Sequence, residues 1–237
     1  MDNIFYSEQI YDDYIILSED EANHAIKVLR KKCGDEINVV DGLGSLYQTS
    51  IELDDVKNCR LNILSVNKDY DKKEYYIHIA ISPPKSHDRL EIFIEKAVEI
   101  GVDEISFILT SRSERNNIKL NRVNKLIINA MKQSLKASKP IVNDIVSIAN
   151  FLNMCNNRQR YIAHLNEEKN DHLITTAPKE DNYCILIGPE GDFSSEEVAE
   201  ALEYRFKSVG LGHNRLRTET AAIVACHILN LVNDING

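Results

Sequence analysis

The chain has 237 residues, of which 43% are hydrophobic and 27% are charged. This composition is typical of a soluble globular protein with one large domain, or with a small domain joined to a medium one. The N-terminus has neither a basic segment nor an apolar core, and no apolar run is long enough to cross a bilayer, so we expect a cytoplasmic protein without a membrane partner. The five cysteines are widely spread and never in C-x-x-C spacing, which argues against disulfides and against a metal site.

The formal net charge is −9, but the charges are unevenly distributed along the chain. Residues 111–140 contain eight Lys and Arg and one acid, whereas residues 165–203 contain eleven Asp and Glu and two Lys. Such an asymmetry can give an acidic protein a basic face, and local potential decides where a polyanion docks. The simpler interpretation, which is favoured without further observations, is that the basic run is a solvated helix face.

Short strands and one helix are predicted for the first part of the chain. Ser18 and Glu21 have the spacing of a capping box, so a helix is expected to start there and to end near Arg30. Apolar residues that alternate at 45–53 and 60–66 predict two strands. Several short strands with few helices suggest a small β-barrel.

Beyond a polar stretch at 67–74, strands alternate with helices along the chain. This alternation predicts an α/β domain with a mainly parallel sheet. We therefore predict a small domain at 1–72 and a larger domain at 73–237. In the larger domain the expected strands cover 75–81, 104–109, 161–165, 183–187 and 207–211, and the expected helices cover 87–100, 121–136, 196–204 and 218–232.

Two loops near the C-terminus have the composition of a ligand pocket. One expected strand leads into Gly188-Pro-Glu-Gly191, and another leads into Gly210-Leu-Gly212 and then into the charged segment Arg215-Leu-Arg-Thr-Glu219 at a helix start. Taken alone, a Gly-Pro pair usually marks only a turn, and neither loop is a Walker A or G-x-G-x-x-G motif. Two such loops at the carboxyl ends of strands nevertheless suggest one shared pocket, because open α/β sheets place their ligands there.

Seven sequence blocks occur in order along nearly the whole chain. They are His24-Ala-Ile-Lys-Val-Leu-Arg30 with Gly34-Asp35, Lys96-Ala-Val-Glu-Ile-Gly-Val102, Arg112-Ser-Glu-Arg115, Gln133-Ser134 with Pro140, Ile187-Gly-Pro-Glu-Gly-Asp-Phe193, Leu211-Gly212 and Leu216-Arg-Thr-Glu-Thr-Ala221. Together these blocks resemble the RsmE family of 16S ribosomal RNA uracil-N3 methyltransferases. This family belongs to the SPOUT class, which uses S-adenosylmethionine.

The resemblance implies an N-terminal PUA-like β-barrel that helps to bind RNA, followed by a SPOUT domain with a deep trefoil knot. It also implies an obligate homodimer whose subunits complete each active site, with the 16S rRNA of the small ribosomal subunit as partner. After Gly212 this chain departs from the family pattern, because His213-Asn-Arg215 replaces a Pro-Arg-Ile type segment and shifts the basic residue by one. The implied cofactor contacts are Gly188, Pro189, Glu190, Gly191, Leu211, Gly212, Leu216 and Arg217.

The reaction that the resemblance implies is methylation of N3 of a specific uridine. N3 of neutral uracil carries a proton, so the site needs a proton acceptor and a group that stabilises negative charge on the flanking oxygens. Arg217, or Arg112 of the partner subunit, is predicted to stabilise that charge. Glu190 or Glu219 is predicted to accept the proton, although a glutamate in a first helical turn can equally complement the helix dipole.

Basic side chains outside the two loops are candidates for phosphate contacts with RNA. They are Arg30, Lys31, Lys32, Arg112, Arg115, Lys132 and Lys136. Two alternative functions remain open. One is a SPOUT enzyme that modifies another RNA nucleotide, and the other is a PUA-like RNA-binding or ribosome-assembly factor without catalysis, which would have no reason to bind S-adenosylmethionine.

Overall fold

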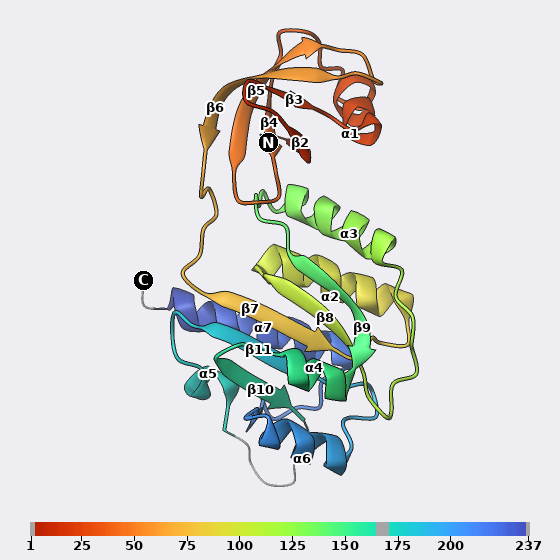
Figure 1. Cartoon of the computed structure of the whole chain (residues 1–237), viewed down its shortest axis with the longest axis vertical. Coiled ribbons are helices and arrows are strands. Elements are labelled where there is room, and N and C mark those ends of the chain that lie inside the picture. Colours follow the sequence, from red (N-terminus) through yellow and green to blue (C-terminus); the bar gives the residue numbers. More distant parts are fainter. Residues whose placement is uncertain (1–2, 165–170, 236–237) are drawn as a thin grey trace. The chain divides into compact units, whose positions relative to one another are not determined.

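The computed structural model describes residues 3–164 and 171–235 (Figure 1). Contacts divide the chain into two compact units. The first contains Met1–Lys72 and also Ile128–Lys139, and the second contains Lys73–Ile127 and Pro140–Gly237. A division into two continuous stretches, as expected from the sequence, does not include this return of the chain to the first unit.

The first unit is built on a six-stranded, barrel-like sheet in the order β1-β4-β5-β6-β3-β2. Its pairs are antiparallel, except that β1 runs parallel to β4. One face encloses a small core that includes Phe5, Ile15, Val39 and Leu61, all with no exposed surface. The strands are β1 (Ile4–Tyr6), β2 (Gln9–Ile10), β3 (Tyr14–Ile16), β4 (Glu36–Val40), β5 (Leu46–Leu53) and β6 (Arg60–Asn67).

The helix of the first unit starts as predicted but does not continue as a regular α-helix. The Ser18 hydroxyl accepts a hydrogen bond from Glu21 N, so it caps α1 (Glu19–Asn23). The chain then widens into a π-helical turn, η1 (His24–Val28). The Glu21 carboxylate does not close the expected capping box, because it accepts instead from Tyr6 N at 3.2 Å and thereby ties the helix to β1.

The second unit is an α/β domain whose six strands all pair in parallel, in the order β12-β10-β11-β7-β8-β9. The prediction of a parallel sheet is therefore confirmed, whereas the knot remains a prediction. Residue 165, the expected end of one strand, lies outside the described residues. The strands are β7 (Tyr76–Ile81), β8 (Glu104–Leu109), β9 (Ile141–Ser147), β10 (Gln159–Ala163), β11 (Asn182–Ile187) and β12 (Lys207–Val209).

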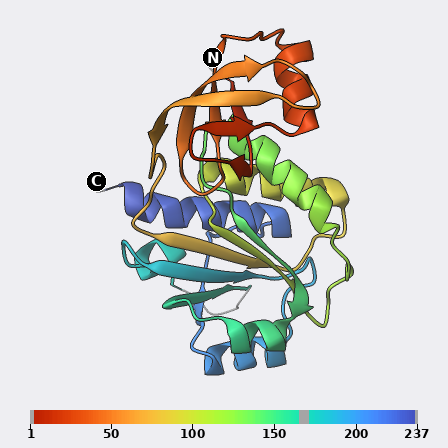
Figure 2. The ribbon, with the colours of Figure 1, turned by 45° about the horizontal axis from the view of Figure 1, so that its top comes forward.

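Helices cover both faces of this sheet (Figures 1 and 2). One face carries α2 (His87–Ile100) and α7 (Thr218–Asp234), which pack against each other and, through α7, against β7 and β11. The other face carries α4 (Ile148–Met154) and α6 (Ser195–Glu203) over a core that includes Phe151 and Phe206. The second unit also contains the short α5 (Leu173–Thr176) and the first part of α3 (Leu120–Gln133), whose residues from Ile128 onward belong to the first unit.

Helix ends in the second unit follow local chemistry to different degrees. Ser194 and Glu197 form the complete capping box that their spacing predicts at the start of α6. Gly101 ends α2 with φ of 118°, as expected for a left-handed C-cap. Ser86 stands at the N-cap of α2, but its side chain makes no capping hydrogen bond. Within the described residues, no helix is both long and apolar enough to span a bilayer.

Candidate active site

Three neighbouring strands of the second unit end beside one cavity. Strand β10 pairs in parallel with both β11 and β12, so the carboxyl ends of these three strands are neighbours. Described residues at and beyond these ends line a cavity of about 780 Å³. This volume lies in the upper part of the range of small-molecule sites, roughly 300–1,000 Å³. The expectation of a single pocket shared by two glycine-containing loops is therefore met.

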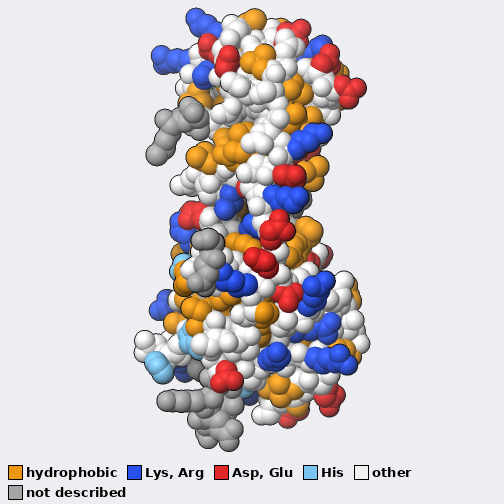
Figure 3. Space-filling view, turned by 90° about the vertical axis from the view of Figure 1, so that its left-hand side faces the viewer, with side chains coloured by type: hydrophobic (Ala, Val, Ile, Leu, Met, Phe, Trp, Pro, Cys, Tyr) orange, Lys and Arg blue, Asp and Glu red, His pale blue; other side chains and the backbone are white. Residues whose placement is uncertain are grey.

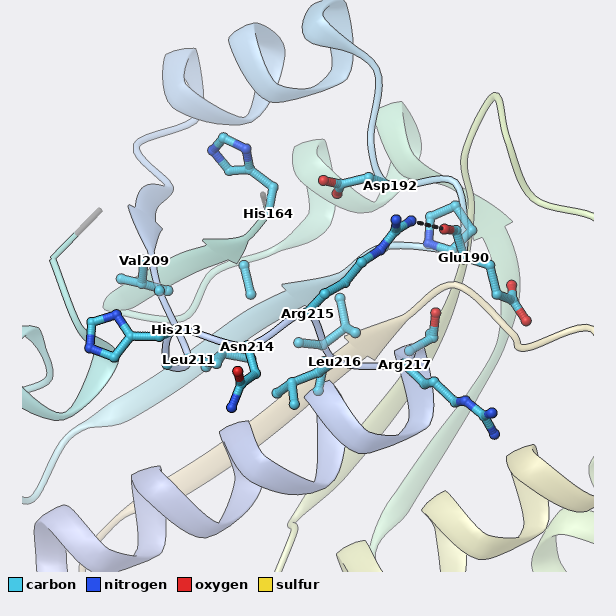
Figure 4. A pocket seen from close by; sticks show the side chains of 18 of the residues that line it. His164, Glu190, Asp192, Val209, Leu211, His213, Asn214, Arg215, Leu216 and Arg217 are labelled. Atoms are coloured by element: carbon cyan, nitrogen blue, oxygen red, sulfur yellow. Dashed lines mark hydrogen bonds between the residues drawn. The ribbon is translucent and has the colours of Figure 1, made fainter. Parts of the chain in front are cut away.

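Most residues that the sequence assigned to a cofactor line this cavity (Figure 4). Glu190 and Arg217 lie toward one end, whereas His164 and His213 lie toward the other (Figure 4). Gly191 is absent from the lining. The predicted residues that form the wall are Gly188, Pro189, Glu190, Leu211, Gly212, Leu216 and Arg217. Their roles remain predictions.

Other lining residues were not among the predicted cofactor contacts. Ala163 is the last residue of β10 and His164 directly follows it, and this position at a strand end could have indicated both. Arg89 comes from α2, far away in the sequence, and its one signal is a basic residue in the first turn of a helix. The others are His172, Ile187, Asp192, Val209, Gly210, His213, Asn214, Arg215, Thr218 and Ala221.

Glycine is favoured at two positions of the pocket loops for different physical reasons. A Cβ at Gly188 would stand 3.1 Å from the ring of Phe193, so a side chain there would require this buried ring to shift by a few tenths of an ångström. Gly212 has open space around it, but its φ of +134° is one that other residues rarely adopt. The first position thus depends on space and the second on backbone conformation.

Arg112 braces the first loop from outside the cavity. Its Nη1 donates to the carbonyl oxygen of Gly191 at 2.7 Å and to that of Phe193 at 3.3 Å. The neighbouring Ser111 N donates to the Glu197 carboxylate at 2.6 Å, which joins the same turn to the start of α6. Arg112 therefore stabilises the loop within its own chain, and a catalytic role in a partner's site stays a prediction.

One end of the cavity holds a cluster of opposite charges. Arg89 Nη1 lies 3.7 Å from Glu190 Oε1, and Arg89 Nε lies 3.6 Å from Glu219 Oε1. Glu190 Oε1 also accepts from Lys85 N at 3.3 Å. The Glu219 side chain is 9% exposed and that of Glu190 is 33% exposed, so the two predicted proton acceptors differ sharply in burial.

Polar contacts also connect the loops to one another. The shifted Arg215 points toward the loop that contains Glu190 and donates from Nη2 to the Glu190 carbonyl oxygen at 3.5 Å (Figure 4). His164 lies with Nε2 2.9 Å from the Ser208 hydroxyl. Although it is displaced by one position, Arg215 therefore still has a hydrogen-bond partner in the loop that contains Glu190.

The predicted RNA contacts have very different surroundings. In the first unit, Arg30 and Lys32 are exposed, but Lys132 forms an ion pair with Glu21, and their side chains are only 17% and 11% exposed. In the second unit, Arg115 donates to the Lys85 carbonyl oxygen and contacts His87, so its guanidinium is partly engaged. On the face drawn in Figure 3, Lys and Arg side chains are interspersed with Asp and Glu.

The other three candidates are at least partly accessible. Lys31 is half-buried and its Nζ donates to the Glu36 carbonyl oxygen at 3.3 Å, Lys136 is half-buried, and Arg112 is exposed. Arg30, Lys31 and Lys32 thus follow one another just beyond η1 and are at least partly accessible. Among the candidates, Lys132 is the least suited to a phosphate because its charge is already neutralised in a half-buried pair.

Comparison with known proteins gives the class of the two units. Residues 71–230 match the family model of an RNA methyltransferase domain, and residues 17–64 match an RNA methyltransferase PUA domain. A Porphyromonas gingivalis structure described as a probable rRNA-methyltransferase is 38% identical, covers 99% of this chain and all of its own, and has a TM-score of 0.93. A Legionella pneumophila methyltransferase structure with bound SAM is 26% identical, covers 98% of both chains, and has a TM-score of 0.88.

Named relatives define the family more closely. Ribosomal RNA small subunit methyltransferase E of Rickettsia conorii is 30% identical over 89% of this chain and 87% of its own length. The enzyme of the same name from Bacillus subtilis is 25% identical over 92% of this chain and 90% of its own. The chain belongs to the ribosomal RNA small subunit methyltransferase E family, which is the RsmE family expected from its sequence blocks.

Proposed function

We propose that this protein transfers a methyl group from S-adenosylmethionine to N3 of a specific uridine in the 16S rRNA of the small ribosomal subunit. The observation that carries the proposal is the single cavity that collects seven of the eight cofactor contacts predicted from the sequence. Its relatives are small-subunit rRNA methyltransferases by name, and the Legionella neighbour holds SAM. The choice of uridine N3 rests on the family resemblance.

The lining residues fit S-adenosylmethionine chemically. Ile187, Leu211 and Leu216 give the cavity apolar walls suited to a flat adenine ring, and the glycine-containing loops bring backbone groups to the same wall. Glu190 and Asp192 place carboxylates near a ligand that carries a positive sulfur. When bound, this cofactor supplies an electrophilic methyl group.

The protein's own residues must prepare the nitrogen that receives the methyl group. Removal of the N3 proton leaves negative charge on the flanking oxygens, so the site needs a proton acceptor and a group that stabilises negative charge. Glu190 is the more accessible of the two predicted acceptors, and Arg217 lies toward the same end of the cavity (Figure 4). We assign the proton to Glu190 and charge stabilisation to Arg217, with Arg112 of the partner subunit as the alternative.

The protein would bind RNA through its first domain and act as a homodimer. The domain at 1–72 would bind RNA, and Arg30 to Lys32 would contact phosphates from the end of η1. A homodimer is supported by α7, where Ile223, Val224 and Leu231 remain half-exposed on a largely apolar helix. We expect this ribosome-modifying role to be carried out in the cytoplasm.

The test is transfer of labelled methyl groups to small subunits from a strain that lacks this modification, with naked rRNA in parallel. We expect about one methyl group per subunit with wild-type protein. Arg217→Ala should reduce turnover roughly 100-fold, the cost of one transition-state donor, while it leaves a folded protein. No transfer together with no calorimetric binding of S-adenosylmethionine would favour the non-catalytic RNA-binding alternative.

A further inference from the structure

Arg89 is a cationic residue of the cavity that the sequence blocks did not indicate. It lies in the first turn of α2, lines the cavity, and has a side chain that is 35% exposed. The N-terminus of a helix carries the positive end of the dipole, so an arginine there is electrostatically unfavourable. Its position is therefore better explained by an anionic partner or ligand than by helix stability.

Two carboxylates flank the Arg89 guanidinium without taking up its donors. The separations from Glu190 Oε1 and Glu219 Oε1 are 3.7 and 3.6 Å, which exceed hydrogen-bond length. Among the described residues, none accepts a hydrogen bond from Arg89. The guanidinium thus has charge partners that hold it at the cavity wall, while its planar set of N–H groups remains available to a ligand.

Glu219 is the deeper of the two charge partners. Its Oε2 atom is buried and has no hydrogen-bond partner among the described residues. A carboxylate oxygen in that state is costly, and such groups in folded proteins call for a functional explanation. Glu219 stands beside Thr218, which lines the cavity, but does not itself line it. It therefore acts on the cavity through Arg89.

We propose that Arg89 is a catalytic residue that donates hydrogen bonds to a carbonyl oxygen beside N3 of the target uracil, with Glu219 as its positioning residue. This inference rests on the proposed function. As the N3–H bond breaks, the proton passes to Glu190 and the electron pair spreads onto the flanking oxygens, where Arg89 stabilises it. N3 then bonds to the methyl carbon, and the donor's sulfur keeps the electron pair of the broken C–S bond.

The test compares small subunits whose rRNA contains uridine with subunits that contain 5-fluorouridine, whose N3 proton is more acidic. On uridine, Arg89→Ala should lower kcat about 100-fold, and Arg89→Lys and Glu219→Gln should cause smaller losses. On 5-fluorouridine the loss for Arg89→Ala should shrink to about tenfold or less, because the fluorine already stabilises the anion. Lys96→Ala, an exposed change elsewhere on α2, is the control and should match wild type with both substrates.

Calorimetry with S-adenosylmethionine and thermal melting complete the test. The proposal expects unchanged Kd and a folded protein for both Arg89 variants. Equal losses of kcat on the two substrates, or a Kd that rises in step with the loss of activity, would overturn the role of Arg89 alone. If wild-type protein forms no N3-methyluridine, both this inference and the proposed function are wrong.

Discussion

The guanidinium of Arg112 is bonded to the carbonyl oxygen of Gly191, with Nη1 and oxygen 2.7 Å apart. The same nitrogen reaches the Phe193 carbonyl oxygen at 3.3 Å. A Cβ at Gly191 would stand 3.3 Å from Arg112 Cδ, so the glycine also makes room for the aliphatic part of the side chain. Arg112 therefore stabilises the loop that contains Gly188 to Glu190, although Arg112 does not itself line the cavity.

Arg112→Ala should weaken binding of S-adenosylmethionine although Arg112 does not line the site. Loss of these exposed, charge-assisted bonds loosens the loop, and we expect a cost of about 1 kcal/mol, or roughly fivefold in Kd. Isothermal calorimetry measures the change. Arg158→Ala, which removes an arginine that is 81% exposed, serves as control and should leave Kd unchanged. An unaltered Kd in Arg112→Ala would show that the loop holds its shape unaided.

Lys132 should matter for stability rather than for RNA binding. Lys132→Ala leaves the Glu21 carboxylate, 11% exposed, without its cation, and we expect a loss of about 3 kcal/mol in the free energy of unfolding. Urea denaturation measures the loss, and Lys125→Ala on the exposed side of α3 should have little effect. If Lys132→Ala is as stable as wild type but binds RNA with a shallower salt dependence, its role as a phosphate contact is restored.

His78 should make the protein less stable in mild acid. Burial lowers the pKa of the His78 imidazole below its ordinary value of 6.5, and the nearby Glu104 carboxylate opposes this shift only in part. The folded protein thus keeps His78 neutral, bonded through Nε2 to Ser106 at 2.8 Å. The unfolded chain takes up the proton first as the pH falls. The contribution of His78 to the free energy of unfolding is therefore fully present above about pH 6.5. It is lost as the pH falls toward the lower pKa of the folded state.

The corresponding measurement is urea unfolding between pH 5 and pH 8. His78 can contribute at most about 1.4 kcal/mol per pH unit to the slope. His78→Gln keeps a polar group near Ser106 but cannot titrate, so its stability should change less over this range. Parallel pH profiles for the two proteins would contradict the assignment of the acid sensitivity to His78.

The five cysteines should differ in reactivity. Cys33 is exposed, whereas Cys59, Cys155, Cys184 and Cys226 are buried. Burial also raises the pKa of Cys59 to about 11. A thiol reagent at pH 8 should therefore modify one cysteine in the native protein and five in denaturant, and Cys33→Ser should remove the fast phase. A second fast-reacting thiol in the native state would show that one of the buried sites opens readily.

Local chemistry allowed much of the second unit to be predicted from the sequence. The box at Ser194 and Glu197 and the left-handed Gly101 each depend on neighbouring residues, so their spacing is informative. Strand β9 was missed because its exposed and half-buried residues give no apolar run. The short helix α4, only seven residues long, has too few turns for a clear period.

Long-range contacts account for what the sequence could not indicate. The return of 128–139 to the first unit depends on bonds such as those from Ala137 N and Ser138 N to Asp71, which no local pattern announces. The two pocket loops could be placed together because both follow parallel strands. The place of Arg89 in the same pocket could not be predicted, because its approach to Glu219 requires the packing of α2 against α7.

We propose above all that N3 of a uridine is methylated in the cavity lined by residues 188–190 and 209–218. The most direct test is to incubate wild-type protein with unmodified small subunits and S-adenosylmethionine, digest the rRNA to nucleosides, and identify the methylated product by mass spectrometry against standards. We predict N3-methyluridine at a single site, formed roughly 100-fold more slowly with Arg217→Ala. A methylated ribose, a methylated purine, or no methylated nucleoside at all would contradict this proposal.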